Sequence, residues 1–310
     1  MSIIELRNVC FTPQGEKEKT IDNLNLRVEK GTVNVLLGDS FSGNVAVLQM
    51  LNRVIPLSTT GELEGDIIIN GINTTEKKPE IREMATHVGM VLQQPDLQIV
   101  SLTVEGDITF GPQCLGYSMD EIKKWVDFAV EAVRLKGFES RNPKTLSGGE
   151  IQSLAIGGVI AMNPKILAMI DPVAMLDPIG KLRVYSTLRH LNEEYGTTIV
   201  LSEAGMNIES AAEIADRIIV MNKGRIVVEG APSQVFENKF VAEVGFPEVT
   251  QLFIKLRGKR RSLTPRLPVT LDDAEKEIRR LVKGKSIKAS RRAKVEEVDK
   301  KGEPIIKLGQ

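Results

Sequence analysis

An apolar run at residues 33–37 leads directly into a turn bounded by two glycines, Gly38 and Gly43, with four residues between them. The run is typical of a buried strand. The Gly-x4-Gly spacing is that of a phosphate-binding loop, in which a strand turns sharply into a helix N-terminus. We therefore predict a strand, a tight turn and a helix beginning at about Gly43, which together form a unit of an α/β fold.

The polar chemistry of such a loop is missing here, because Asn44 and Val45 stand where lysine and serine or threonine are expected. The lysine places a charge on the β- and γ-phosphates, and the hydroxyl is a magnesium ligand. The loss of the lysine removes a charge-assisted hydrogen bond to the phosphates, which contributes about 1.5–3 kcal/mol. The backbone N–H groups remain, so the sequence leaves weakened ATP binding open. The candidate nucleotide-binding residues of this loop are Gly38, Asp39, Ser40, Ser42, Gly43, Asn44 and Val45.

A second motif, Leu146-Ser147-Gly148-Gly149-Glu150, follows about a hundred residues later. The order of the two motifs resembles an ABC-type ATP-binding cassette over residues 3–236. The resemblance implies an α/β P-loop NTPase fold with a mixed sheet core, an antiparallel β subdomain and a helical subdomain. Residues 4–11 and 20–26 look like its first two antiparallel strands. Phe11 then falls at the place that stacks on adenine, or is simply a strand aromatic in the core.

Two further segments carry the resemblance. Residues 88–98 look like the Q-loop, with Gln93 as the glutamine that contacts the metal and couples the domains. Residues 104–112 are similar to the energy-coupling-factor and cobalt-importer subgroup of cassettes.

The Walker B region lacks one of its two carboxylates. The strand at residues 166–170 ends before Asp171, and Leu176 and Asp177 look like the D-loop. Counting from either neighbouring motif puts Ile170 where the family has its magnesium-holding aspartate, and Asp171 where it has the general base. A slip of one residue would make Asp171 the Walker B aspartate and put Pro172 at the base.

The switch histidine of the family is also absent. Counting forward from the strand at residues 198–201 puts its place at Ala204, and counting back from residues 215–217 puts it at Met206, which indicates a small insertion. The two histidines of the chain, His87 and His190, lie elsewhere and are interpreted as structural or surface residues.

These losses all fall on groups that touch the γ-phosphate, its metal or the attacking water, so we predict that the chain's own site does not hydrolyse ATP and holds no metal. In the family, two cassettes pack head to tail, and the signature of each completes the ATP site of the other. Residues 146–150 are thus a signature that this chain lends to a partner. The alternative is that Ser147 only caps a helix. Ser153 also stands where the family usually has arginine.

The sequence predicts three regions: a cassette at 1–236 with a helical insert at about 96–145, a C-terminal helical extension at 237–282, and a basic, flexible tail at 283–310. Within the insert, residues 119–133 have apolar residues at helical spacing. Cys10 and Cys114 lack metal-ligand spacing and are assigned to a strand and a loop. No apolar run approaches the roughly 18–20 residues that span a bilayer, so we expect a cytoplasmic protein, or one peripheral on the inner face of the cell membrane.

Three functions remain open at this stage. In the first, the chain is the non-hydrolysing subunit of an energy-coupling-type transporter, with a competent cassette and an integral membrane subunit, bound through the Q-loop region, as partners. The second is a scaffold in a soluble complex, similar to archaeal ATPases of metalloenzyme activation. The third is a nucleotide sensor without hydrolysis. The basic tail could contact an acidic surface in any of them.

Overall fold

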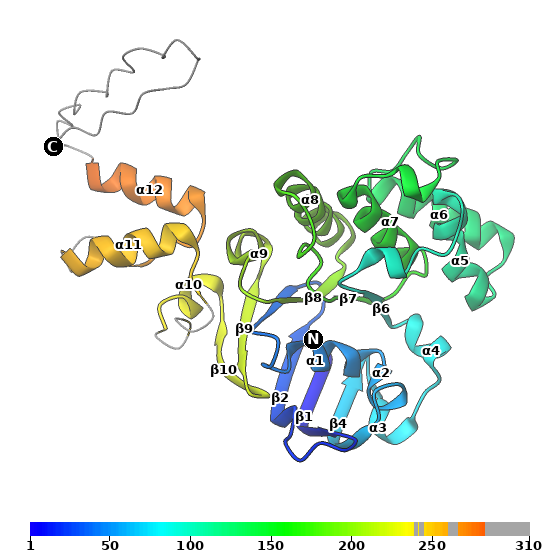
Figure 1. Cartoon of the computed structure of the whole chain (residues 1–310), viewed down its shortest axis with the longest axis horizontal. Helices are drawn as coiled ribbons and strands as arrows, with labels where there is room; N and C mark the ends of the chain where they lie inside the picture. Colours follow the sequence, from blue (N-terminus) through cyan, green and yellow to red (C-terminus); the bar gives the residue numbers. More distant parts are fainter. Residues whose placement is uncertain (239–240, 242–244, 260–265, 283–310) are drawn as a thin grey trace, which may run out of the picture.

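The computed structural model describes residues 1–238, 241, 245–259 and 266–282. The predicted basic tail at 283–310 lies outside the described residues. Figure 1 shows two sheets one above the other, with helices between and beside them, a layer of helices above the upper sheet, and a pair of C-terminal helices to one side.

A four-stranded antiparallel sheet forms the lower layer, with the strand order β2-β1-β4-β5. The sequence prediction of two antiparallel strands at the start of the chain is confirmed, since β1 pairs with β2 from Ser2↔Glu29 to Phe11↔Ile21. Buried and exposed residues alternate along β2, as a sheet with one apolar face requires. The strands are β1 (Ser2–Pro13), β2 (Ile21–Glu29), β4 (Gly61–Ile69) and β5 (Ile72–Asn73).

A six-stranded mixed sheet forms the second layer, in the order β10-β9-β3-β8-β7-β6. Five strands are parallel and β10 pairs antiparallel to β9. All five residues of the predicted central strand are buried, because the sheet has helices on both faces. The strands are β3 (Val33–Leu37), β6 (Val88–Val91), β7 (Ile166–Met169), β8 (Thr198–Glu203), β9 (Arg217–Asn222) and β10 (Arg225–Gly230).

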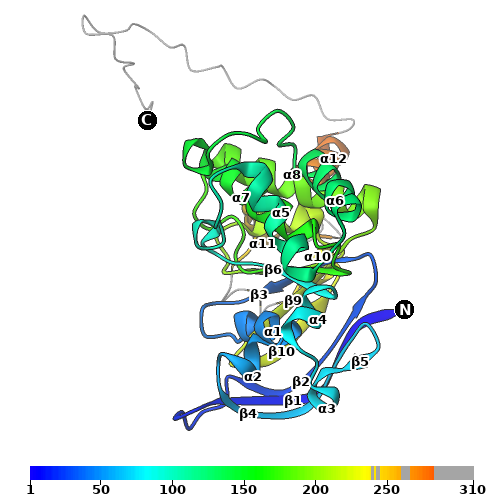
Figure 2. The same cartoon turned by 90° about the vertical axis from the view of Figure 1, so that its right-hand side faces the viewer.

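The two faces of the mixed sheet contribute to two separate apolar cores. One core joins this sheet to the antiparallel sheet through α1 (Asn44–Leu51). The other lies between the mixed sheet and the helical layer above it. Figure 2 shows the same layering from the side. The short helices of the lower layer are α2 (Val54–Leu57), α3 (Thr74–Lys77) and α4 (Ile81–Ala85).

The helical layer follows from local signals in the sequence. The helix predicted at residues 119–133 is α6 (Met119–Ala132), which begins at a capping box formed by Ser118 and Glu121. The prediction of a loop at Cys114 is wrong, since Cys114 lies near the end of α5, where Gly116 stops the helix only two residues later. The other elements here are the 3-10 turns η1 (Pro95–Leu97) and η2 (Pro143–Thr145), and the helices α5 (Val104–Leu115), α7 (Gly148–Ile160), α8 (Pro178–Tyr195), α9 (Ile208–Ile214) and α10 (Pro232–Val235).

The C-terminal helices α11 (Glu248–Lys259) and α12 (Leu271–Val282) share a small apolar core of their own around Phe253. Glu237 ties this unit to the end of α10. Its carboxylate pairs with Arg257 at 2.8 Å and accepts the Leu267 N–H at 2.7 Å. None of the described helices is long and apolar enough to cross a membrane.

Candidate functional site

The glycine turn adopts the predicted strand-turn-helix geometry. Gly38 follows β3 and donates its N–H to the Glu203 carbonyl at the end of β8, at 3.2 Å. Gly43 has a left-handed φ of 92°, and α1 begins at the next residue. A side chain at Gly43 would collide with the Thr20 carbonyl, at 2.8 Å from its Cβ, so both the conformation and the space require glycine.

The side chain of Asn44, a residue of this loop, fills the interior of the loop. Asn44 is only 2% exposed. Its Nδ2 donates to the Gly38 carbonyl at 3.1 Å, and its Oδ1 accepts the Val45 N–H at 2.7 Å. The amide therefore bridges the two ends of the turn.

Other backbone donors of the turn are also bound within it. The Phe41 N–H donates to Asp39 Oδ1 at 3.0 Å, and the Asn44 N–H to Ser42 Oγ at 3.4 Å. Ser42 is buried, while Asp39 and Ser40 are exposed. The N–H groups of Phe41, Asn44 and Val45 could otherwise bind an anion, but each donates to a side chain of the loop itself.

Ile170 and Asp171 follow β7, beside this turn. Ile170 is buried in the same core as Ala46 and Val47 of α1. Asp171 has a left-handed φ of 40°, and its N–H donates to Ser202 Oγ at 3.0 Å. The same hydroxyl donates to Asp171 Oδ1 at 2.8 Å. The carboxylate at the base position is therefore bound to a neighbouring strand.

The segment expected to hold the switch histidine is organised by a buried acid that sequence reasoning missed. Glu203, the last residue of β8, is 2% exposed. Its Oε1 accepts the N–H groups of Gly205 and Asn207 at 3.1 and 3.0 Å. Ala204 and Met206, the two predicted switch places, are both exposed. A charged residue directly after an apolar strand, with glycine and asparagine just beyond it, was the signal available in the sequence.

Burial raises the pKa of the Glu203 carboxyl above its ordinary value, and the nearby Asp171 adds to the rise, although the hydrogen bonds from Asn207 oppose it. Tyr185 of α8 lies beside this carboxyl. Burial, and then the charge of Glu203, raise the pKa of Tyr185 as well, so its hydroxyl keeps its proton.

A Glu203→Gln substitution should stabilise the fold above pH 4.5 and have little effect below it. The unfolded carboxyl ionises near its ordinary pKa of 4.5, whereas the folded one holds its proton to higher pH, so rising pH costs the wild type stability. Glutamine does not titrate, and its Oε1 can still accept both N–H groups. We expect a Tm higher by about 2–4 °C at neutral pH, measured by calorimetry across pH. A gain of equal size at pH 4 would contradict this account.

Gln93 lies in the exposed loop after β6. The loop is held by Gln98, which was not singled out from the sequence. Gln98 Oε1 accepts the Leu92 N–H at 2.7 Å, and its Nε2 donates to the Met90 carbonyl at 3.0 Å. Gln98 thereby holds the backbone of the two residues Met90 and Leu92 that precede Gln93.

Phe11, the predicted adenine-stacking residue, has its side chain buried in the core. Its ring is 1% exposed and belongs to the core between the two sheets. Phe11 pairs with Ile21 on one side and Leu63 on the other. No face of the ring is open to a ligand, so the alternative interpretation, a strand aromatic in the core, describes this residue.

The signature residues lie in the helical layer, where Ser147 caps α7. Ser147 Oγ accepts the Glu150 N–H and donates to the Glu150 carboxylate at 2.9 Å, which completes a capping box. Glu150 also pairs with Arg183 of α8 at 3.2 Å. Hydrogen bonds from Ser147, followed by the pair with Arg183, lower the pKa of Glu150 below its ordinary value.

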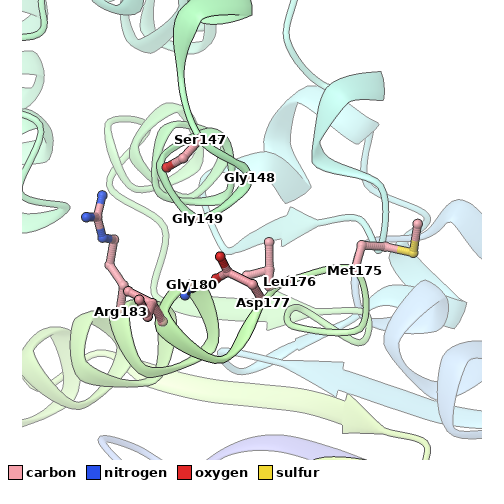
Figure 3. Close-up of a pocket in the computed structure, with 9 residues that line it drawn as sticks. Ser147, Gly148, Gly149, Met175, Leu176, Asp177, Gly180 and Arg183 are labelled. Carbon is pink, nitrogen blue, oxygen red and sulfur yellow. Dashed lines mark hydrogen bonds between the residues drawn. The ribbon is translucent and has the colours of Figure 1, made fainter. Parts of the chain in front are cut away.

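A pocket of about 310 Å³ opens between the signature and the D-loop. Figure 3 shows Ser147, Gly148 and Gly149 on one side and Asp177 and Gly180 on the other. Asp177 Oδ1 caps α8 by accepting the Gly180 N–H at 2.6 Å. A Cβ on Gly149 would lie 3.0 Å from Gly180 Cα, so the glycines permit the close approach of α7 and α8.

The pocket wall also includes Met175, the first residue of the predicted D-loop segment, and two side chains that the sequence did not indicate, Ile179 and Arg183. The methionine and isoleucine are 72% and 73% exposed. Leu176 of the predicted D-loop is half-buried against the helical core. The signature side of the molecule thus offers an open, partly apolar surface around a helix N-terminus.

The structure therefore separates the predicted site residues into two groups. The turn at residues 38–45, Ile170, Asp171 and the switch segment meet at the carboxyl ends of β3, β7 and β8. The signature and D-loop line the pocket in the helical layer. Figures 1 and 2 both place α1 and α7 on opposite sides of the mixed sheet, and their side chains belong to different cores.

Comparison with known proteins identifies this architecture. The sequence profile of the ABC transporter family matches residues 21–174. Together with relatives that are 38% and 40% identical over more than four fifths of the chain, this match shows that the chain belongs to the ATP-binding cassette family of ABC transporters.

Several relatives share most of their length with this chain. The energy-coupling factor transporter ATP-binding protein EcfA2 of Clostridium perfringens is 40% identical, with 84% of this chain and 91% of that protein covered. EcfA1 of Clostridium novyi is 38% identical, with 83% and 91% covered. The solved structure of cbiO1 from Clostridium perfringens, part of the ABC transporter complex cbiONQ, matches with a TM-score of 0.70 and 25% identity, covering 84% and 99% of the two chains.

Proposed function

We propose that this chain is a catalytically degenerate nucleotide-binding subunit of an energy-coupling-type transporter. In this proposal it pairs with a complete cassette, to which it lends residues 146–150, and contacts a membrane subunit through the loop around Gln93. The energy-coupling relatives support the transporter class. In the proposed pair of cassettes, the two ATP sites would differ, because only the partner has complete Walker motifs.

The observation that carries the asymmetry is the Asn44 side chain inside the turn. A phosphate in this loop needs the backbone N–H groups that point into it and a cation nearby. Asn44 supplies no charge, and its amide already bonds to Gly38 and Val45. ATP would have to break these contacts without gaining the charge-assisted bond that a lysine provides, so ATP binds weakly or not at all.

The residues beside the turn do not fit a magnesium ion either. Val45 has no side-chain oxygen, and Ile170 is a buried apolar residue packed among the residues of α1. Of the carboxylates nearby, Asp171 accepts from Ser202, Asp39 accepts the Phe41 N–H, and Glu203 is buried and accepts the N–H groups of Gly205 and Asn207. Magnesium requires several oxygen ligands in octahedral geometry, so no step of hydrolysis is assigned to this site.

The signature, in contrast, keeps the groups that would act on a nucleotide held by another cassette. The N-terminus of α7 and the Ser147 hydroxyl lie at the open pocket, and a helix N-terminus favours a phosphate. The exposed Met175 and Ile179 beside it suit burial against a partner. A mixed pair would then contain one complete ATP site and one incomplete site.

Affinity purification of the tagged chain from its native organism in mild detergent tests this function. We expect a second cassette with complete Walker motifs and an integral membrane protein, identified by mass spectrometry. A set of soluble proteins without a membrane subunit would instead make the chain a scaffold. Recovery of the chain alone, with ATP bound tightly by the purified protein, would favour the nucleotide sensor and overturn the proposal.

A further inference from the structure

A second pocket, which shares no residue with either group of site residues, lies in the lower layer where α2 and α3 lie beside β4 (Figure 1). Its volume is about 210 Å³. The wall is mostly apolar, but it contains two cations, Arg53 and Lys78, and no acid. We propose that this pocket binds a phosphate group, either inorganic phosphate or a small phosphomonoester.

Arg53 is the main reason for this assignment. The residue is only 7% exposed, and Nη1 donates to the Pro79 carbonyl. Among the described residues, no carboxylate forms an ion pair with Arg53, and no other acceptor receives its remaining guanidinium N–H groups. The charge of Arg53 is therefore not neutralised by a carboxylate of the described residues, although its guanidinium lies at the pocket wall. A bound anion would supply the missing charge.

The glutamate side chains of the neighbouring strand β4 point away from the pocket, so an anion that pairs with Arg53 would have to come from solution. Gly61, Leu63 and Ile67 of β4 line the pocket, whereas Glu62 and Glu64 alternate with them and therefore point to the other face of the sheet. Glu62 lines a different pocket on that face. The strand thus keeps its carboxylates away from Arg53.

Lys78 adds the second charge at the rim of the pocket. It ends α3 in a left-handed conformation with φ 48° and is exposed, without an ion pair among the described residues. The hydroxyls of Thr74 and Thr75 also lie in the wall, but they donate to the Ile67 carbonyl and to Asn73 Oδ1. The two cations are therefore the groups that recognise the ligand.

The size and donor geometry limit the class of ligand. A guanidinium presents paired N–H donors that match two oxygens of a phosphate, and an ammonium adds a point charge. Pockets for drug-sized ligands are roughly 300–1,000 Å³. This smaller pocket suits a phosphate group with a short substituent better than a whole nucleotide.

Thermal unfolding of the full chain in increasing inorganic phosphate, with chloride at matched ionic strength as reference, tests the proposal. The wild-type Tm should rise with phosphate, because a ligand that binds only the folded state stabilises it. Lys78→Asn should weaken the apparent phosphate affinity by about tenfold or more, since asparagine tolerates the backbone of Lys78. Lys77→Asn, in the same helix but outside the pocket, should behave as wild type.

Arg53→Gln provides a second variant and should abolish the response, with circular dichroism to verify folding. An unresponsive wild type would overturn the proposal. Equal phosphate affinity in wild type and Lys78→Asn would assign the effect to another site, such as the turn at residues 38–45, and would also overturn it. An equal response to acetate would replace the phosphate assignment with a carboxylate.

Discussion

Replacing Ser147 with alanine in this chain should lower the ATPase rate of its complex with a complete cassette by roughly 10- to 100-fold. The change removes one hydroxyl at the open pocket, and a hydrogen bond to a charged group contributes about 1.5–3 kcal/mol. The measurement is steady-state phosphate release by the reconstituted pair, with the partner cassette unchanged. The defect should appear in the maximal rate, because the partner's own loop still binds ATP.

Ser118→Ala is a matched control for this experiment. Ser118 and Glu121 form the same capping box at α6 that Ser147 and Glu150 form at α7. Each alanine should cost about 1 kcal/mol of stability through the lost cap. Only Ser147 lines the signature pocket. If both variants reduce the rate equally, or if Ser147→Ala leaves it intact, residues 146–150 are not lent to a partner.

The second large effect is a gain of magnesium-dependent ATP affinity in the triple variant Asn44→Lys, Val45→Ser and Ile170→Asp. The lysine restores a charge for the phosphates and removes the amide that fills the turn, while the serine and aspartate restore two oxygen ligands. We expect ATP to bind about 100-fold more tightly with magnesium than to the wild type. A titration with a fluorescent ATP analogue, with and without magnesium, measures this.

The double variant Asn44→Lys and Val45→Ser is the comparison for the triple variant, since it keeps Ile170 in the core. It should gain affinity with a smaller dependence on magnesium. Circular dichroism must accompany the triple variant, because aspartate at a buried position destabilises the fold. A folded triple variant whose ATP affinity is unchanged would show that Ile170 is not at the magnesium position.

The parts of the fold that depend on local sequence were predictable. The strand at residues 33–37 and the helix beginning after Gly43 follow from an apolar run and a glycine turn, and both are confirmed. The helix predicted at residues 119–133 ends within a residue of α6, because its cap and its apolar spacing are both local. The antiparallel and mixed sheets agree with the class of fold that the motifs indicated.

The site was less predictable, because its decisive contacts join distant residues. Asp171 and Ser202 are 31 positions apart, and Glu150 and Arg183 come from different helices. The sequence left open whether Phe11 reaches a nucleotide, but its side chain is buried in a core built from segments far apart in the chain. The sequence showed that Asn44 lacks a charge, while only the structure shows its amide bonded across the turn.

The surface around the signature has a consequence for the amount of this protein in a cell. Met175, Ile179 and Leu182 are each more than 60% exposed, on the D-loop and at the start of α8. A copy without a partner presents these apolar side chains to water, where chaperones and proteases recognise such surfaces. In the proposed pair with a second cassette, surplus copies of this chain would be removed faster than paired ones, so the two proteins would reach matched levels even if they were synthesised in unequal amounts.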